Sequence, residues 1–107
     1  MAETFKRVIA DLDLAPGTIY TVPAGTTALL LGVRVSNRTA TAVTFNVTVN
    51  DGVNTRGLVG LNTPLPIGSS LEIGGESKIV MLAGDILAGN SSADGDAAII
   101  VSFMEIT

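Results

Sequence analysis

The sequence predicts an all-β fold, namely an antiparallel β-sandwich of jelly-roll type with about eight strands. Short segments rich in aliphatic and β-branched residues alternate with turn signals at intervals of about eight to twelve residues, which is typical of sandwiches and barrels. No segment carries the apolar spacing of an amphipathic helix. A long connection from Leu61 to Ser70 contains two prolines and a glycine, and it indicates a crossing between two sheets.

Composition supports this fold class and narrows the function. The 107 residues are 47% hydrophobic but only 4% aromatic, so the apolar content is mostly aliphatic, and its β-branched part suits strands. A chain of this length forms one domain with one modest core. Cysteine and histidine are both absent, so there is no disulfide framework and no Ser-His-Asp or Cys-His arrangement. We therefore expect no enzyme, no cofactor and no metal.

Charge and hydropathy also exclude some partners. The net charge is −4 and the six basic residues are scattered, whereas nucleic-acid binding needs a basic patch. No segment approaches the roughly 18 uncharged apolar residues of a membrane span. The first residues lack the apolar core and cleavage site of a signal peptide. We expect neither nucleic acid nor membrane as a partner.

Residues 1–14 are predicted to form an extended arm or edge strand ahead of a sandwich domain of residues 15–107. Five charged residues lie among the apolar ones in this segment, with spacing too poor for a helix, and Ala15-Pro16-Gly17 ends it. We expect the arm to contact a neighbouring molecule, with Phe5 and Ile9 as its anchors.

The segment from Thr26 to Asp51 organises the predicted fold. It follows a short strand, Gly17–Val22, and reads as a hairpin of two long strands joined at about Asn37–Thr41. Its second half alternates apolar with polar residues, so that one face is buried and the other wet. Its first half is apolar on both faces, with Ala28, Leu30 and Gly32 opposite the buried set.

Shorter strands complete the predicted sandwich. Asp51-Gly52 is a turn signal, and we expect an exposed loop over Gly89–Gly95. The expected strands are Thr55–Gly60, Leu71–Ile73, Ser77–Leu82, Ile86–Ala88 and the long final strand Asp96–Thr107. The expected core combines the inward faces of the long strands: Leu29, Leu31, Val33, Val35, Val43, Phe45, Val47, Val49, Ile79, Met81, Ile99, Val101 and Phe103.

Two strands carry more apolar surface than one small core can bury. Both faces of Ala28–Gly32 and of Ala98–Ile106 are apolar, and an exposed patch of this kind is unusual in a monomer. We therefore predict a homo-oligomer that packs around Leu30, Ile100, Met104 and Ile106. In the alternative, the N-terminal arm of the same chain covers the second face.

Acidic residues offer only weak candidates for chemistry. Asp11 and Asp13 lie two residues apart, a spacing that suits a solvated loop or strand better than a glycosidase cleft. Asn90, Asp94 and Asp96 present oxygen atoms that Ca²⁺ accepts, but the spacing of a bidentate glutamate in an EF-hand loop is missing. Turn chemistry accounts for the same three residues, and the sequence leaves both explanations open.

Several pieces of sequence occur in a recognisable order: IYTVPAGTTALLLGVRVSN, a Thr/Val/Asn-alternating strand that ends in NDG, LAGDIL, and the terminal VSFMEIT. Together they resemble the small virion structural proteins of tailed bacteriophages. The resemblance covers about Thr18 to Thr107 and carries over no catalytic residue. It implies a jelly-roll or β-sandwich module that decorates the capsid as a cement protein, often as a trimer, or that attaches at the neck and tail.

The resemblance sets the expected partners and location. We expect the chain to bind itself, as a trimer, together with the major capsid protein or other virion proteins, in a virion assembled in the host cytoplasm. One alternative is a structural module of the neck, collar or tail fibre. Another is a carbohydrate- or receptor-binding sandwich, for which the single Tyr20 and three phenylalanines supply few sugar-stacking rings.

Overall fold

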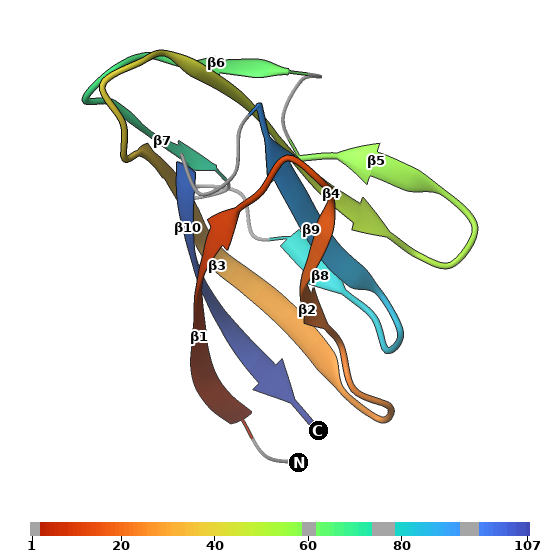
Figure 1. Cartoon of the computed structure of the whole chain (residues 1–107). Helices are drawn as coiled ribbons and strands as arrows, with labels where there is room; N and C mark the ends of the chain where they lie inside the picture. Colours follow the sequence, from red (N-terminus) through yellow and green to blue (C-terminus); the bar gives the residue numbers. More distant parts are fainter. Residues whose placement is uncertain (1–2, 59–61, 74–78, 93–96) are drawn as a thin grey trace.

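The computed structural model describes residues 3–58, 62–73, 79–92 and 97–107. Within these ranges the chain forms ten strands and no helix, which confirms the all-β prediction. The strands make two five-stranded antiparallel sheets, one on each side of the molecule (Figure 1). This arrangement is consistent with a β-sandwich. The described residues include no helix long and apolar enough to cross a membrane.

Each sheet is assembled from strands far apart in the sequence. The first sheet has the order β1-β10-β3-β7, and β8 also pairs with β3. Its strands are β1 (Glu3–Leu12), β10 (Ala97–Ile106), β3 (Thr27–Asn37), β7 (Ser70–Ile73) and β8 (Ile79–Met81). The second sheet has the order β2-β9-β4-β5, and β6 also pairs with β4. Its strands are β2 (Gly17–Thr21), β9 (Ile86–Ser91), β4 (Val43–Asn50), β5 (Thr55–Gly57) and β6 (Thr63–Leu65).

The predicted hairpin between the two long strands is wrong. The strands exist, but β3 lies in the first sheet and β4 in the second, so their connection crosses between the sheets. Asn37 organises this corner: its Nδ2 donates to the carbonyl oxygens of Thr41 at 2.9 Å and Leu65 at 3.0 Å. Its Oδ1 accepts the backbone N–H of Thr39 at 2.8 Å. These bonds satisfy backbone groups that a hairpin ladder would otherwise pair.

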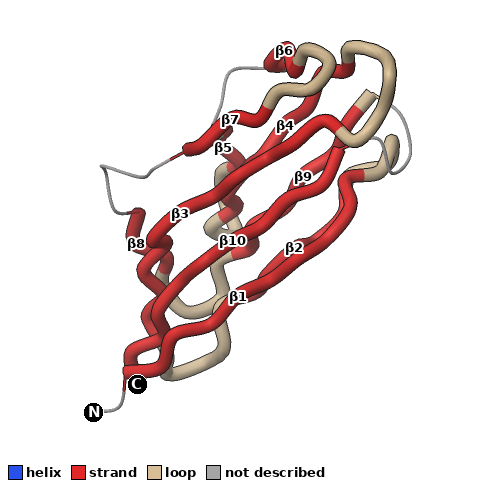
Figure 2. The backbone as a smooth tube through the Cα atoms, turned by 90° about the vertical axis from the view of Figure 1, so that its left-hand side faces the viewer, coloured by secondary structure: helices blue, strands red, loops and turns tan. Residues whose placement is uncertain are grey.

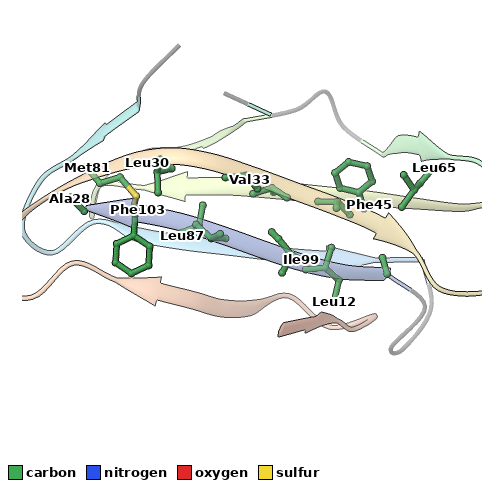
Figure 3. Close-up of a cluster of buried hydrophobic side chains, with 14 of the residues drawn as sticks. Leu12, Ala28, Leu30, Val33, Phe45, Leu65, Met81, Leu87, Ile99 and Phe103 are labelled. Atoms are coloured by element: carbon green, nitrogen blue, oxygen red, sulfur yellow. The ribbon is translucent and has the colours of Figure 1, made fainter. Parts of the chain in front are cut away.

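The core lies between the sheets and is aliphatic apart from two phenylalanines (Figure 3). Most of the predicted core residues are buried or packed against the core. The buried apolar residues are Leu12, Val22, Ala28, Leu30, Val33, Val35, Val43, Phe45, Val47, Leu65, Met81, Leu87, Ala97, Ile99, Val101 and Phe103. The prediction was wrong for two residues, Leu29 and Leu31, which are only partly buried and lie outside the cluster.

A β-bulge explains that error. In the β10–β3 register, Ser102 pairs with Gly32 and Phe103 with Leu30, which leaves Leu31 as an extra residue on β3. Because one inserted residue reverses which side chains point inward, Leu30 faces the core before the bulge and Val33 faces it afterwards. Leu30 is 2% exposed and appears among the core side chains in Figure 3. Its predicted place in an oligomer interface is therefore wrong.

Two short segments also differ from expectation. Residues 89–91 were expected in an exposed loop, but they extend β9, which pairs with β4 as far as Ser91. Ser91 is buried, and its hydroxyl donates to the carbonyl oxygen of Leu12 at 2.9 Å. The expected loop over 61–70 contains the short strand β6. Among the described strands β6 pairs only with β4, so it lies at a sheet edge, where Pro64 is tolerated.

The N-terminal segment pairs with β10 along its whole length, from Glu3 opposite Ile106 to Leu12 opposite Ala97. It lies at the edge of the first sheet, where β10 is its neighbour. Leu12 is 1% exposed and belongs to the core, with Val8 and Ala10 packed against it. The segment therefore contributes packing to the sandwich as well as presenting an edge.

Candidate interaction surface on the outer face of the first sheet

The outer face of the first sheet is the side of β1, β10 and β3 that points away from the core. No described segment covers it, and Figure 2 looks directly onto it. Several large apolar side chains on this face are exposed: Phe5 is 76% exposed, Ile9 60%, Val80 59% and Ile100 41%. Leu29, Leu31, Met104 and Ile106 are half-buried there.

Strand register brings together residues that the sequence had assigned to two different contacts. Phe5 and Ile9 were expected as anchors of an arm, and Ile100, Met104 and Ile106 as an oligomer interface. The structure pairs Phe5 with Met104 and Ile9 with Ile100 across the β1–β10 ladder, and such opposite residues share one face. The five residues therefore form part of one surface, and their role in binding stays a prediction.

Two shallow hollows lie on this surface, where Ser102 and Gly32 have small side chains or none. Arg7, Ser102 and Gly32 lie side by side across β1, β10 and β3. A shallow hollow of about 450 Å³ is lined by Phe5, Lys6, Arg7, Leu31, Ser102 and Phe103. A second one of about 270 Å³, which shares Ser102, is lined by Gly32, Val33, Arg34, Glu72, Ile100 and Ser102. Sequence reasoning missed Arg7, Gly32 and Ser102; the only signal was a glycine inside a long strand.

Exposed ion pairs lie toward one end of this face. Arg38 contacts Asp11 at 2.6 Å, and Arg34 contacts Glu72 at 3.4 Å. All four side chains are more than half exposed, and pairs of this kind contribute about 0–1 kcal/mol to stability. They give the outer face a mixed charge, although the chain as a whole is acidic.

A buried polar group lies on the inner side of the same strands. The Tyr20 hydroxyl donates to Glu105 Oε2 at 2.5 Å, and Lys6 Nζ contacts Glu105 Oε1 at 2.7 Å. Burial, together with the neighbouring carboxylate, raises the pKa of Tyr20. The Lys6 ammonium and then the Tyr20 hydroxyl lower the pKa of Glu105. The Tyr20 ring packs on Phe103 with centroids 4.2 Å apart, so the group ties the two sheets together.

This group predicts that the protein loses stability in acid. A lowered native pKa means that Glu105 stabilises the fold above the ordinary glutamate pKa of about 4.3 and stops doing so as the pH falls through the native value. Asp51 acts in the same direction, since the N–H groups of Asn54 and Val53 lower its pKa.

Thermal melts between pH 7 and pH 3 measure this effect. We expect the melting temperature to fall below about pH 4.3. Glu105→Gln should start lower at pH 7 and fall less steeply. The matched variant Glu72→Gln, at an exposed carboxylate, should keep the wild-type profile. A Glu105→Gln protein with the wild-type pH profile would contradict the assignment.

The second sheet carries an uncharged polar hollow. It has a volume of about 390 Å³ and is lined by Leu14, Thr44, Asn46, Asn62, Asn90, Ser91 and Ser92. Asn46 Oδ1 accepts the backbone N–H of Asn62 at 2.8 Å. Asn90 was a candidate Ca²⁺ ligand; the other two candidates, Asp94 and Asp96, lie outside the described residues. Among the described residues, no three Asp or Glu side chains gather as a metal site would require.

Comparison with known proteins gives a likeness in fold. No protein-family model and no curated protein sequence matches the chain. One solved structure, the acidic stable capsid structure of Helicobacter pylori bacteriophage KHP30, is similar with a TM-score of 0.56 and 8% identity, over 100% of this chain and 94% of that chain. At this identity the likeness shows a shared fold.

Two other solved structures are pentameric capsid proteins isolated from metagenomic phage sequences. They are 20% and 17% identical to this chain, with TM-scores of 0.43 and 0.42. Each match covers 92% of this chain but only 59% or 60% of the other. The chain thus spans about three fifths of their length.

Proposed function

We propose that this chain is a non-enzymatic structural protein of a bacteriophage virion, a capsid decoration or cement protein that binds the outer capsid surface as a homo-oligomer and stabilises the head. The observation that carries the proposal is the apolar outer face of the first sheet, which no described segment covers. Exposed apolar patches of this kind mark protein contacts. The end-to-end likeness in fold to a phage capsid structure supports a place for the chain in a particle.

The jelly-roll type is part of this proposal, and the strand order supports it. The first four strands alternate between the sheets, and the last two return to fill them. β9 inserts between β2 and β4, while β10 inserts between β1 and β3. Interleaving of early and late strands across two sheets is the arrangement of jelly rolls, which are common in viral capsid domains.

Chemistry in the described residues supports a structural role over catalysis. The sequence has no His or Cys, and Asp11 is engaged by Arg38. Tyr20, a possible platform for sugars, is occupied by Phe103 and Glu105. The proposed partners are further copies of the chain, with a trimer as the form that the sequence resemblance implies, and the major capsid protein or other virion proteins.

Quantitative mass spectrometry of purified particles tests the proposal. A decoration protein should be present in hundreds of copies per particle, whereas a few dozen copies would place the chain in the neck, collar or tail. Absence from washed particles would overturn the virion role altogether. Particles that lack the protein should lose their genome at lower temperature than complete ones if the protein stabilises the head.

A further inference from the structure

We propose that the outer face of the first sheet binds a second copy of the chain through a two-fold contact. In this contact Phe5 of each copy lies over Arg7 of the other, and Leu29 of each copy lies over Gly32 of the other. The inference rests on the self-association proposed above. It adds the residues of the contact, and it gives a two-fold dimer in place of the trimer that the sequence resemblance implies.

Gly32 is the first observation. It lies inside the long strand β3, where glycine is unfavourable because it adds backbone entropy and packs nothing. Among the described residues, a Cβ built at this position would meet only Glu72 Oε1, at 3.9 Å. Gly32 is not among the glycines with positive φ. Neither a positive φ nor crowding within the described chain therefore requires a glycine here. Apart from the adjacent β-bulge, the reason that favours glycine at such a position is the close approach of another molecule.

The second observation is an exposed aromatic ring beside the hollow. Phe5 is 76% exposed and lines the same hollow as Ser102 and Leu31. Phenylalanine is a preferred residue in the centre of protein interfaces. A projecting ring and a cavity therefore occur on one surface, and this is the requirement for a surface that is complementary to itself.

The register of β1, β10 and β3 determines where the two-fold axis of the contact lies. Phe5 and Arg7 are two residues apart on β1, hence roughly 7 Å along the strand. A two-fold axis that lies in the contact plane and runs across the strands midway between them exchanges their positions. The row Phe5–Met104–Leu29 of one copy then lies over the row Arg7–Ser102–Gly32 of the other. The same operation makes the reciprocal contact, so each interaction occurs twice.

Arg7 supplies a specific attraction in this arrangement. It is exposed, and it makes no salt bridge within 4.0 Å to any acidic group among the described residues. The face of an aromatic ring attracts a guanidinium placed above it. Phe5 of the second copy would lie over Arg7 and provide that ring.

Size and charge suit a second copy as the occupant. The broad side of the molecule measures 45 by 26 Å, which leaves room for the roughly 800 Å² per partner of a standard interface. Each chain carries a net charge of −4, which would oppose contact between acidic surfaces. The outer face instead mixes Arg7 and Arg34 with Glu72, so two such faces do not repel strongly.

Sedimentation equilibrium of the purified full chain tests the contact. We expect the wild type to be a dimer at tens of micromolar. Phe5→Ser removes the ring and Gly32→Val fills the space that faces Leu29 of the other copy, and each should raise the dimer Kd at least tenfold. Gly32→Val should not lower the melting temperature of the monomer, because among the described residues its Cβ would meet only Glu72 Oε1, at the ordinary contact distance of 3.9 Å. The control Val53→Ser removes an 87% exposed apolar side chain in the β4–β5 turn and should leave Kd within twofold.

Cross-linking provides an independent measurement, since the chain has no natural cysteine. A mixture of Phe5→Cys and Arg7→Cys chains should form a mixed disulfide dimer faster than either variant alone, and a mixture of Phe5→Cys with Val53→Cys should not. A trimeric mass, or a Gly32→Val chain that dimerises like the wild type, would overturn the two-fold contact while the particle measurement still decides the virion role. A wild type that stays monomeric would also overturn it.

Discussion

Val101→Asp is expected to prevent folding, whereas the same replacement at the adjacent Ile100 should leave a folded protein. Val101 lies on β10 between Val8 and Val33 of the neighbouring strands, and its side chain is fully buried in the core. An ionised carboxylate without a partner costs several kcal/mol there. Since a domain of this size has only about 5–15 kcal/mol of stability, the substitution removes most or all of it.

Ile100 is the matched control because it differs from Val101 by one position and points the other way. It is 41% exposed on the outer face, so an aspartate there stays in water. Circular dichroism and thermal melts of the two purified variants give the comparison. We expect a wild-type spectrum and a cooperative transition for Ile100→Asp, and insoluble or unfolded protein for Val101→Asp. If both variants fold, or both fail, the assignment of the two faces of β10 is wrong.

These two neighbours show what the sequence could predict. Apolar and polar residues alternate along β4, and buried side chains alternate with less buried ones along the whole of β10. Period-two reasoning therefore placed Ile99, Val101, Phe103 and Phe45 correctly in the core. The same reasoning placed Ile100 on the opposite side, where the structure has it. Alternation is informative when the strand keeps its register, because then each residue's face follows from its neighbour's.

β3 does not keep its register, because it contains the bulge. Its apolar run from Ala28 to Leu31 offers no contrast between the two faces, so nothing in the run itself locates the extra residue of the bulge. The bulge is set by pairing with β10, which lies about seventy residues away in sequence. Leu29 and Leu30 therefore exchanged their predicted places. Gly32, next to the bulge, was the available signal.

The pairing of strands was the other feature that the sequence could not predict. Strand periodicity identifies β3 and β4 but does not say which strand each one pairs with. Adjacent strands in sequence pair or neighbour each other only about two thirds of the time. The exposure of individual apolar residues on the outer face was predicted, because the strands carry more apolar residues than one core can bury. Their gathering around Arg7, Ser102 and Gly32 arises from the β1–β10–β3 register, which no local pattern encodes.

The two mid-strand glycines, Gly89 and Gly32, should respond oppositely to the same change. An added Cβ at Gly89 would lie 2.9 Å from the backbone oxygen of Asn46 and 3.0 Å from Leu12 Cδ2. The oxygen cannot move away freely, because Asn46 lies on β4, which is paired with β9 in the middle of the second sheet. Gly89→Ala should therefore destabilise the fold by about 1–3 kcal/mol, as overpacking does in other cores.

Gly32→Ala is the matched control, and for it we expect the ordinary preference of strands for alanine over glycine, a gain of about 0.5–1 kcal/mol. Urea unfolding of both variants at a concentration where the chain is monomeric measures the two changes separately from association. The melting temperature should shift in the same sense, by roughly 4–8 °C per kcal/mol for a domain of this size. A Gly89→Ala chain as stable as the wild type would mean that β9 and β4 approach less closely than the structure places them, and the packing of Leu12 beneath β9 would have to be revised with it.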